Sequence, residues 1–511
     1  MLRSLPKIWS EAKPVHGRAA VITLQEQFPA AGQCAIVLLN VFTFLRMKQE
    51  TLKELQRILD HAGPKSLLTS WEDRVCYSYD ATGQSFLPDA VALPTTAEQV
   101  AALLRLANQH RFPIIPRGAG SGVTGGALPT AGGVVVSFSR MNRILELDTA
   151  NMIAVVEPGL ITGELQAALR HCGLMYPPDP ASLQFCSIGG NAAECAGGPS
   201  AVKYGVTRDY ILGLQAVLPT GEIIRTGVRT EKGVVGYDLT RLLIGSEGTL
   251  AIFTQLILRL LPLPEAKRTF LLSFTALSEA SKVVAEILAA GLLPCTLEYM
   301  DRTAIDAVRD RLQQSLPEGT AALLLVEFDG TENEVAQQAT RFTTFIQEQG
   351  NCLLRQARDT QETADLWLAR RSISPAVLSL RPHKIAEDVV VPRSKIPELV
   401  VFTEELSVEL KLLILTFGHA GDGNIHVNIM LDKSKPEEHR NGLEAKERLF
   451  RFVLSLGGTL SGEHGIGITK SAFLPLEIDP ATLGLMRRLK QLFDPNNILN
   501  PGKIFPLDCS T

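Results

Sequence analysis

The run GSGVTG at residues 120–125 has the G-x-G-x-x-G spacing of a dinucleotide-binding loop, but its continuation does not suit that fold. The spacing marks a Rossmann domain only where the loop leaves a strand and opens a helix. Here Gly126, Pro129 and AGGVVVSF (131–138) follow, which predict a turn and another strand. We therefore do not expect a Rossmann domain or direct use of NAD. Closely spaced glycines still let backbone N–H groups surround a phosphate, so the run predicts a phosphate-binding loop.

Two more glycine-rich runs occur in the same region. SIGGNAAECAGG (187–198) comes behind the proline-rich turn YPPDPAS (176–182), and GSEGTLAI (245–252) comes later. The rest of residues 133–260 predicts mostly strands, such as GVVVSF, LQAVLPTG and LAIFTQLILRLLPLP. Three such loops in one domain predict a long ligand whose contacts are spread over the chain.

Composition narrows the class of protein. The 511 residues are enough for two or three domains, and 45% hydrophobic and 20% charged residues are typical of a globular protein. The net charge of −4, without a basic stripe, gives no reason to expect nucleic acid. None of the eight cysteines stands in C-x-x-C spacing, which argues against an internal iron–sulfur cluster or zinc ribbon and suits a reducing cytosol.

The first 46 residues differ from the rest. AIVLLNVFTFL (35–45) is apolar but shorter than the roughly 20 residues of a membrane-spanning helix. Met47 then begins MKQETLKELQRILDHAG, a pattern typical of an amphipathic helix that ends at Gly63. Our hypothesis is that Met47 is the natural start and that residues 1–46 are an extension outside the native fold.

From about Pro264 the pattern changes to alternating strands and helices. RTFLLSF, CTLEYM, AALLLVEFDG and CLLRQA predict strands, and SEASKVVAEILAAG and ENEVAQQATRFTTFIQEQG predict helices between them. Two successive β-α-β units predict a ferredoxin-like sheet with helices on one face.

The run HAGDGNIH places His419 and His426 around Gly-Asp-Gly. Glycine and aspartate disfavour a helix interior, and the flanking LKLLILTF (410–417) and IHVNIML (425–431) have strand character. We expect His419 to end one strand and His426 to begin the next, with both imidazoles at one end of a sheet. The residues alone fit a pair of ligands as well as a polar hairpin tip.

Several of these motifs, in the same order, resemble one flavoprotein family over about residues 86–506. The chain resembles the D-2-hydroxyacid branch of the vanillyl-alcohol-oxidase fold, which includes glycolate oxidase flavin subunits, D-lactate dehydrogenases and D-2-hydroxyglutarate dehydrogenases. The resemblance implies an α+β fold with a two-part FAD-binding domain of PCMH type, a ferredoxin-like cap or substrate domain and a helical C-terminal segment. It implies an FAD-binding domain at 47–265 with its core at about 86–265, a cap with the metal histidines at 266–435, and a segment at 436–511 that returns to the FAD domain.

The resemblance also implies which residues bind FAD. PRGAGSGVTGG would hold the pyrophosphate, and the later glycine-rich runs and the C-terminal NPGK would line the rest of the cofactor. The pyrophosphate loop contains no histidine, and His110 precedes it, so we expect FAD to be held non-covalently. Cys195 stands where many relatives have asparagine. The implied FAD-binding residues are Pro116, Arg117, Gly118, Ala119, Gly120, Ser121, Gly122, Gly125, Gly126, Pro180, Ser182, Ser187, Gly189, Gly190, Asn191, Gly197, Gly198, Ile252 and Asn500.

A second polar motif, SGEHGIG (461–467), supplies Glu463 and His464. Two histidines and one carboxylate form a ligand set that suits Zn²⁺, or alternatively Mn²⁺ or Fe²⁺, and leaves positions open for a substrate. The resemblance aligns His419, His426 and Glu463 with the metal ligands of the family and His464 with its catalytic base. It also aligns Arg370, Ser374, Lys384 and Asn428 with substrate-binding positions, although Arg371 is a neighbour that could be confused with Arg370.

These residues predict an FAD- and metal-dependent oxidation of a small D-2-hydroxyacid, with D-lactate or glycolate favoured. His464 would take the hydroxyl proton while a hydride passes from Cα to flavin N5. The acceptor would be an iron–sulfur subunit, an electron-transfer flavoprotein or a quinone. We expect a cytoplasmic protein, associated with a membrane only peripherally. The alternatives are a non-redox transferase of the same fold, of ether-lipid synthase type, and a flavin subunit that is active only within a complex.

Overall fold

The computed structural model describes residues 47–312 and 316–505, so the hypothesis about residues 1–46 lies outside the described residues. The first sheet of the described residues has the order β1-β2-β4-β3, in which β2, β4 and β3 are parallel and β1 is antiparallel to β2. Helices α2 and α4 bury their apolar faces against it. The elements are α2 (Gln49–Ile58), β1 (Leu67–Leu68), α3 (Trp71–Val75), β2 (Ala90–Ala92), α4 (Ala97–His110), β3 (Ile114–Arg117) and β4 (Val134–Ser137).

A second sheet completes the N-terminal half with five antiparallel strands in the order β5-β6-β10-β8-β9. The expected loop at residues 187–198 begins as a short helix, α6, beside this sheet. The elements are β5 (Ile144–Asp148), β6 (Ile153–Val156), α5 (Thr162–Arg170), α6 (Ile188–Glu194), α7 (Ala201–Tyr204), β8 (Ile211–Val217), β9 (Ile223–Gly227), α8 (Leu239–Leu243) and β10 (Ile252–Arg259), with a small pair β7 (Leu174–Met175) and β11 (Leu261–Pro262).

The second half of the chain forms a fully antiparallel sheet of seven strands, in the order β15-β12-β14-β13-β17-β18-β16. We call it the cap sheet. Its last three strands come from the segment after the two predicted β-α-β units. The strands are β12 (Ala266–Phe274), β13 (Thr296–Asp301), β14 (Ala322–Gly330), β15 (Leu353–Gln356), β16 (His383–Val390), β17 (Leu413–His419) and β18 (Asn424–Leu431).

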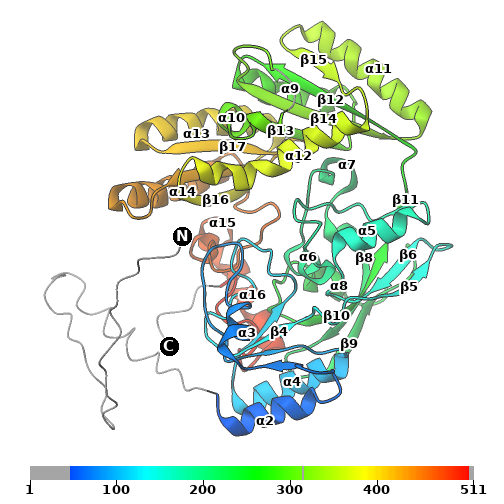
Figure 1. Ribbon diagram of the computed structural model, residues 1–511, viewed down its shortest axis with the longest axis vertical. Coiled ribbons are helices and arrows are strands. Elements are labelled where there is room, and N and C mark those ends of the chain that lie inside the picture. The colour runs from blue at the N-terminus through cyan, green and yellow to red at the C-terminus, as the bar shows by residue number, and fades with distance from the viewer. Residues whose placement is uncertain (1–46, 313–315, 506–511) are drawn as a thin grey trace, which may run out of the picture. The chain divides into compact units, whose positions relative to one another are not determined.

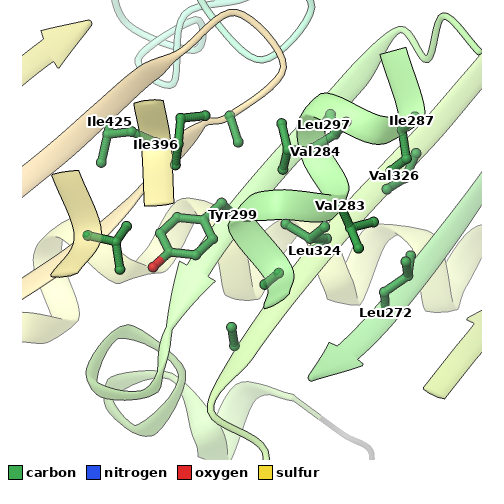
Figure 2. Packing of buried hydrophobic residues seen from close by; sticks show 14 of the residues in the cluster. Leu272, Val283, Val284, Ile287, Leu297, Tyr299, Leu324, Val326, Ile396 and Ile425 are labelled. Atoms are coloured by element: carbon green, nitrogen blue, oxygen red, sulfur yellow. The ribbon is translucent and has the colours of Figure 1, made fainter. Parts of the chain in front are cut away.

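Helices cover both faces of the cap sheet, because successive strand residues point to opposite sides and both sides are apolar. One face packs on α9 (Leu277–Ala289), α11 (Glu332–Gln349), α13 (Ile396–Leu410) and α14 (Pro436–Ser455). Figure 2 shows part of this core, where Leu297, Tyr299 and Leu324 lie close to Val283 and Val284 of α9. The other face packs on α10 (Arg302–Ala307) and α12 (Thr360–Ala376). The sequence predicted helices on one face only, whereas the structure has helices on both faces of the sheet.

The C-terminal residues contact both halves of the structure. Helix α14 shares the apolar core of the cap sheet. The segment expected to leave the cap at residue 436 therefore begins with a helix that still packs on the cap. After α15 (Leu474–Glu477), helix α16 (Pro480–Phe493) is tied to the N-terminal half, where Lys490 Nζ donates to the carbonyl of Thr249 at 3.0 Å. The red α16 can be followed among blue and cyan elements in Figure 1. Next to it, Ile114 N donates to Ile498 O at 2.8 Å, which joins the chain end to β3.

No helix within residues 47–312 and 316–505 combines the length and apolar character needed to cross a bilayer.

Candidate active site

The site begins at the hairpin of β17 and β18. As predicted, β17 ends at His419 and β18 starts just before His426. Gly423 turns the chain with φ +89°, and a Cβ there would lie 2.1 Å from the carbonyl of Val391, so no other residue fits without a shift. Because side chains alternate along a strand, His419 and Phe417 of β17 share a sheet face with His426 and Asn428 of β18. The two imidazole centroids are 5.1 Å apart.

Glu463 and His464 reach the same point from the loop that follows α14. The Oε1 atom of Glu463 lies 3.6 Å from His419 Nε2 and 3.7 Å from His426 Nε2. His464 Nε2 also lies 3.7 Å from this oxygen, and its ring stacks on that of His426 at 5.4 Å. Three imidazoles therefore surround one carboxylate oxygen.

The arrangement of His419, His426 and Glu463 fits a divalent metal ion. Their ligand atoms lie within 4.8 Å of one another, and the separations from Oε1 are too long for hydrogen bonds. Two ligands about 2.1 Å from one tetrahedral Zn²⁺ lie roughly 3.4 Å apart, close to these values. The nitrogen and oxygen donors suit Zn²⁺, Mn²⁺ or Fe²⁺, as the sequence predicted.

The protonation states of His426 and Glu463 suit this role. Although burial acts to lower it, Glu298 and Glu463 raise the pKa of His419 well above its ordinary value, so His419 would release a proton on binding a metal. Burial, together with the neighbouring charge of His419, lowers the pKa of His426 well below its ordinary value, so the ring is neutral and free to bind a metal. Although burial acts to raise it, the imidazoles of His419, His426 and His464 lower the pKa of Glu463 to about 2. Glu463 is therefore a carboxylate throughout the physiological range.

Two buried carboxylates that the sequence did not single out hold this cluster. Glu298 of β13 lies opposite His419 in the register, and its Oε1 is 2.7 Å from His419 Nδ1. Asp388 of β16 accepts hydrogen bonds from the backbone N–H groups of Gly462, Glu463 and His464 at 2.9, 2.8 and 3.0 Å. Carboxylates that contact the second nitrogen of a ligating histidine fix its tautomer and orientation.

The implied substrate residues lie on the same face of the cap sheet and on α12. Arg370 and Ser374 are one turn apart on α12, and Lys384 Nζ donates to Ser374 Oγ at 2.7 Å. Arg370 is buried and stacks on Phe417 at 5.0 Å. Its Nε and the Nδ2 of Asn428 are buried donors without a hydrogen-bond partner among the described residues. Such donors are costly unless something accepts from them.

Arg371 is distinguished from Arg370 by the phase of α12. Arg371 is exposed and stacks on Trp367 at 5.2 Å. Arg370 instead forms an ion pair with Glu298, with 2.5 Å between Nη2 and Oε2. The structure therefore brings Arg370, and not Arg371, to the histidine cluster.

The implied FAD-binding residues converge in the N-terminal half, although they come from distant parts of the sequence. A Cβ on Gly118 would lie 2.2 Å from Ser187 Oγ, so the first and second glycine-rich runs touch. Asn500 Nδ2 donates to the carbonyls of Gly126 and Glu247, at 2.9 Å each. These residues lie at the end of β3 and in the loop after it (Pro116, Arg117, Gly118, Ala119, Gly120, Ser121, Gly122, Gly125, Gly126), in the turn before α6 (Pro180, Ser182), at and around α6 (Ser187, Gly189, Gly190, Asn191, Gly197, Gly198), at the start of β10 (Ile252), and near the C-terminus (Asn500).

Gly122 has no atom of the described residues within 4 Å of its Cβ position, which leaves room for a cofactor phosphate to approach the backbone of this loop. The implied FAD-binding residues also adjoin the histidine cluster. A Cβ on Gly197 would lie 3.0 Å from Glu463 Oε2, and Glu247 accepts hydrogen bonds from the N–H groups of Ile466 and Gly467 at 2.8 and 2.6 Å. Cys195, the departure from the family, ends α6 with φ +57°, a conformation that asparagine adopts more readily.

Comparison with known proteins identifies the family. Residues 88–227 match an FAD binding domain, and residues 263–504 match the C-terminal domain of FAD linked oxidases. The glycolate oxidase subunit GlcD of Bacillus subtilis is 41% identical over 454 residues, which cover 89% of this chain and 97% of that protein. This chain is an FAD-linked oxidase. The D-lactate dehydrogenase of Anaerostipes hadrus is 33% identical over 476 residues, 91% of this chain and 99% of that protein.

Solved structures confirm the fold of this FAD-linked oxidase. A p-cresol methylhydroxylase superposes with a TM-score of 0.75 at 18% identity, over 90% of this chain and 98% of the other. An alkyldihydroxyacetonephosphate synthase superposes with a TM-score of 0.70 at 21% identity, over 89% and 86%. The predicted α+β fold of vanillyl-alcohol-oxidase type, the FAD-binding domain and the oxidoreductase class are thus confirmed.

Proposed function

We propose that this FAD-linked oxidase converts a small D-2-hydroxyacid, D-lactate or glycolate, to the 2-oxoacid with the help of one divalent metal. The observation that carries the proposal is the meeting of His419, His426 and Glu463 with two buried donors, Arg370 Nε and Asn428 Nδ2, that lack acceptors among the described residues. Similarity to a glycolate oxidase subunit and a D-lactate dehydrogenase supports the same substrate class.

The substrate carboxylate is the natural acceptor for these donors. Arginine binds carboxylates strongly through charge-assisted hydrogen bonds, and here Arg370 is buried and held on one side by Glu298. Asn428 lies two residues beyond His426 on the same face of β18, so it would direct an amide donor to the substrate beside the metal. Lys384 and Ser374, joined by a hydrogen bond, would add a second cationic contact.

His464 would accept the proton of the substrate hydroxyl at Nε2. Asp388 lies 3.3 Å from the opposite nitrogen, Nδ1, and fixes the orientation of the ring. Although burial alone would lower it, the charge of Asp388 raises the pKa of His464 above its ordinary value, which favours proton uptake. When bound, a divalent metal would acidify the hydroxyl and FAD would take the hydride from Cα.

The electrons would then leave to an acceptor other than NAD. The relative from Bacillus subtilis is named as a subunit of glycolate oxidase, and we propose that this chain likewise passes electrons to a partner, an iron–sulfur subunit or an electron-transfer flavoprotein, or to a quinone. The described cysteines are free, which supports a cytoplasmic location.

The test is anaerobic flavin absorbance in the purified, FAD-loaded protein. We would add glycolate, D-lactate, L-lactate and D-2-hydroxyglutarate in turn, before and after metal chelation. We expect glycolate or D-lactate to bleach the oxidised-flavin band, chelation to prevent bleaching, and Zn²⁺ or Mn²⁺ to restore it. Bleaching that survives complete chelation would contradict the metal role. An absence of bleaching in the FAD- and metal-loaded protein would contradict the substrate assignment.

A further inference from the structure

Glu298 lies inside the cap sheet with no exposed surface. It is on β13, whose even-numbered residues face α12, and it pairs in register with His419 of β17. Its neighbours on this face include two apolar side chains, Met300 on its own strand and Phe417 on the next. A carboxylate at this position needs partners, because an unpaired charge is strongly unfavourable when it is buried.

The two oxygens of Glu298 have different partners. Oε1 lies 2.7 Å from Nδ1 of His419, and Oε2 lies 2.5 Å from Nη2 of Arg370. The first contact directs the proton on Nδ1 of His419 at Glu298, so Nε2, which faces Glu463, is the nitrogen that would bind a metal. The second contact occupies one end of the Arg370 guanidinium and leaves Nε without an acceptor among the described residues.

The neighbouring Glu327 shows what a purely structural carboxylate looks like in this sheet. It is also buried and faces the same side from β14. Its partners are Lys267 at 3.0 Å, Thr269 at 2.8 Å and the indole N–H of Trp367 at 3.2 Å. None of these partners is a predicted metal or substrate residue, whereas both partners of Glu298 are.

We propose that Glu298 is a positioning residue that couples metal binding to recognition of the substrate carboxylate. One oxygen orients His419 toward the metal, and the other orients Arg370 toward the carboxylate of the hydroxyacid. The inference rests on the proposed function, since it assigns His419 to the metal and Arg370 to the substrate. It adds a single buried side chain through which the two binding events depend on each other.

The experiment compares Glu298→Gln with Glu327→Gln in the FAD-loaded protein. Zn²⁺ affinity is measured by competition with a chelator, and kcat and KM for the active hydroxyacid are measured separately. We expect Glu298→Gln to weaken Zn²⁺ binding about 10- to 100-fold, the usual effect of losing a partner behind a metal ligand, and to raise KM at saturating Zn²⁺. Glu327→Gln removes a similarly buried charge and should change neither value more than about twofold.

A spectroscopic readout separates positioning from general damage to the fold. With Co²⁺ in place of Zn²⁺, Glu298→Gln should alter the visible ligand-field bands while the flavin content stays at one per chain. If Glu298→Gln fails to fold, Arg370→Gln provides the reciprocal measurement. It should raise KM and also shift Zn²⁺ affinity, because Glu298 loses one of its two partners.

The possible failures are distinguishable. A wild-type protein that binds no Zn²⁺ or Co²⁺ would overturn the proposed metal function and this inference with it. A wild-type protein that binds Zn²⁺, with Glu298→Gln equal to it in affinity, Co²⁺ spectrum and KM, would overturn only the inference. Equal losses in Glu298→Gln and Glu327→Gln would also overturn it, since they would indicate a structural role.

Discussion

Asp388 and His464 are joined at two points. Asp388 Oδ2 accepts a hydrogen bond from the backbone N–H of His464 at 3.0 Å, and Asp388 Oδ1 lies 3.3 Å from Nδ1 of its ring. The same carboxylate has no exposed surface and contacts the buried ammonium of Lys470. Although burial acts to raise it, His464 and Lys470 hold the pKa of Asp388 well below its ordinary value. Asp388 thus orients both the main chain and the side chain of the proposed base.

Asp388→Asn should therefore lower the rate of flavin reduction by D-lactate or glycolate by about 10²- to 10⁴-fold, the range that one acid–base group contributes. An amide cannot accept the same set of N–H groups without turning its own donors toward them. Rapid-mixing absorbance under anaerobic conditions measures this rate. Asp432→Asn, at a partly buried position directly after β18, is the control. A wild-type rate in Asp388→Asn would show that His464 is oriented by other means.

The three imidazoles of His419, His426 and His464 lie at nearly equal distances from Glu463 Oε1, so distance does not distinguish a metal ligand from a base. Substitution of single histidines separates the two roles. We expect His426→Asn to lose bound Zn²⁺, and His464→Asn to keep it while the rate of flavin reduction falls about 10²- to 10⁴-fold. Elemental analysis and rapid-mixing absorbance test the two properties on the same samples. Loss of Zn²⁺ in His464→Asn to the same degree would make His464 a ligand instead of a base.

The glycines of the FAD-binding half differ in what surrounds them, which predicts different effects of alanine. A Cβ on Gly189 would lie 2.5 Å from Pro158 Cβ and 2.8 Å from the Pro158 carbonyl, so α6 would have to move. We expect Gly189→Ala to lower the free energy of unfolding by about 1–3 kcal/mol and to reduce the FAD content. No atom of residues 47–312 and 316–505 lies within 4 Å of the Cβ position at Gly122, so Gly122→Ala should change the stability of the FAD-free protein by less than about 0.5 kcal/mol. Denaturant unfolding of the two FAD-free variants decides this, and equal stabilities would contradict it.

The buried carboxyl of Asp301, outside the proposed active site, should make the free energy of unfolding depend on pH. Burial raises the pKa of this carboxyl from its ordinary 3.8 to about 6, against hydrogen bonds from Ala304 and Thr416. Because the folded state binds the proton more tightly, this contribution to stability is complete below pH 3.8 and is lost as the pH rises through about 6. Asp301→Asn should remove this slope, whatever its effect on absolute stability. The free energy of unfolding of both proteins, measured from about pH 4 to pH 7, tests it; parallel curves would contradict it.

Local features of the chain were predictable because turns and strands depend on neighbouring residues. The strand, glycine turn and strand around His419 and His426 form as expected, since glycine and aspartate oppose a helix there and the flanking segments are apolar and β-branched. The glycine-rich runs and the order of the motifs sufficed to indicate FAD and the fold, which the comparisons confirm. The metal and substrate residues stay predictions, although the structure brings them together.

The partners of those residues were decided only by the tertiary structure. Glu298 is 121 residues from His419 and Asp388 is 76 from His464, and neither stands in a motif of its own. They meet the site because the strand order of the cap sheet puts β13 beside β17 and β16 beside β18, with one register for each pair. The choice of Arg370 over Arg371 depends likewise on how α12 is rotated against that sheet. The sequence alone determines which groups are available and where the chain can turn, whereas strand register and burial decide which of those groups touch.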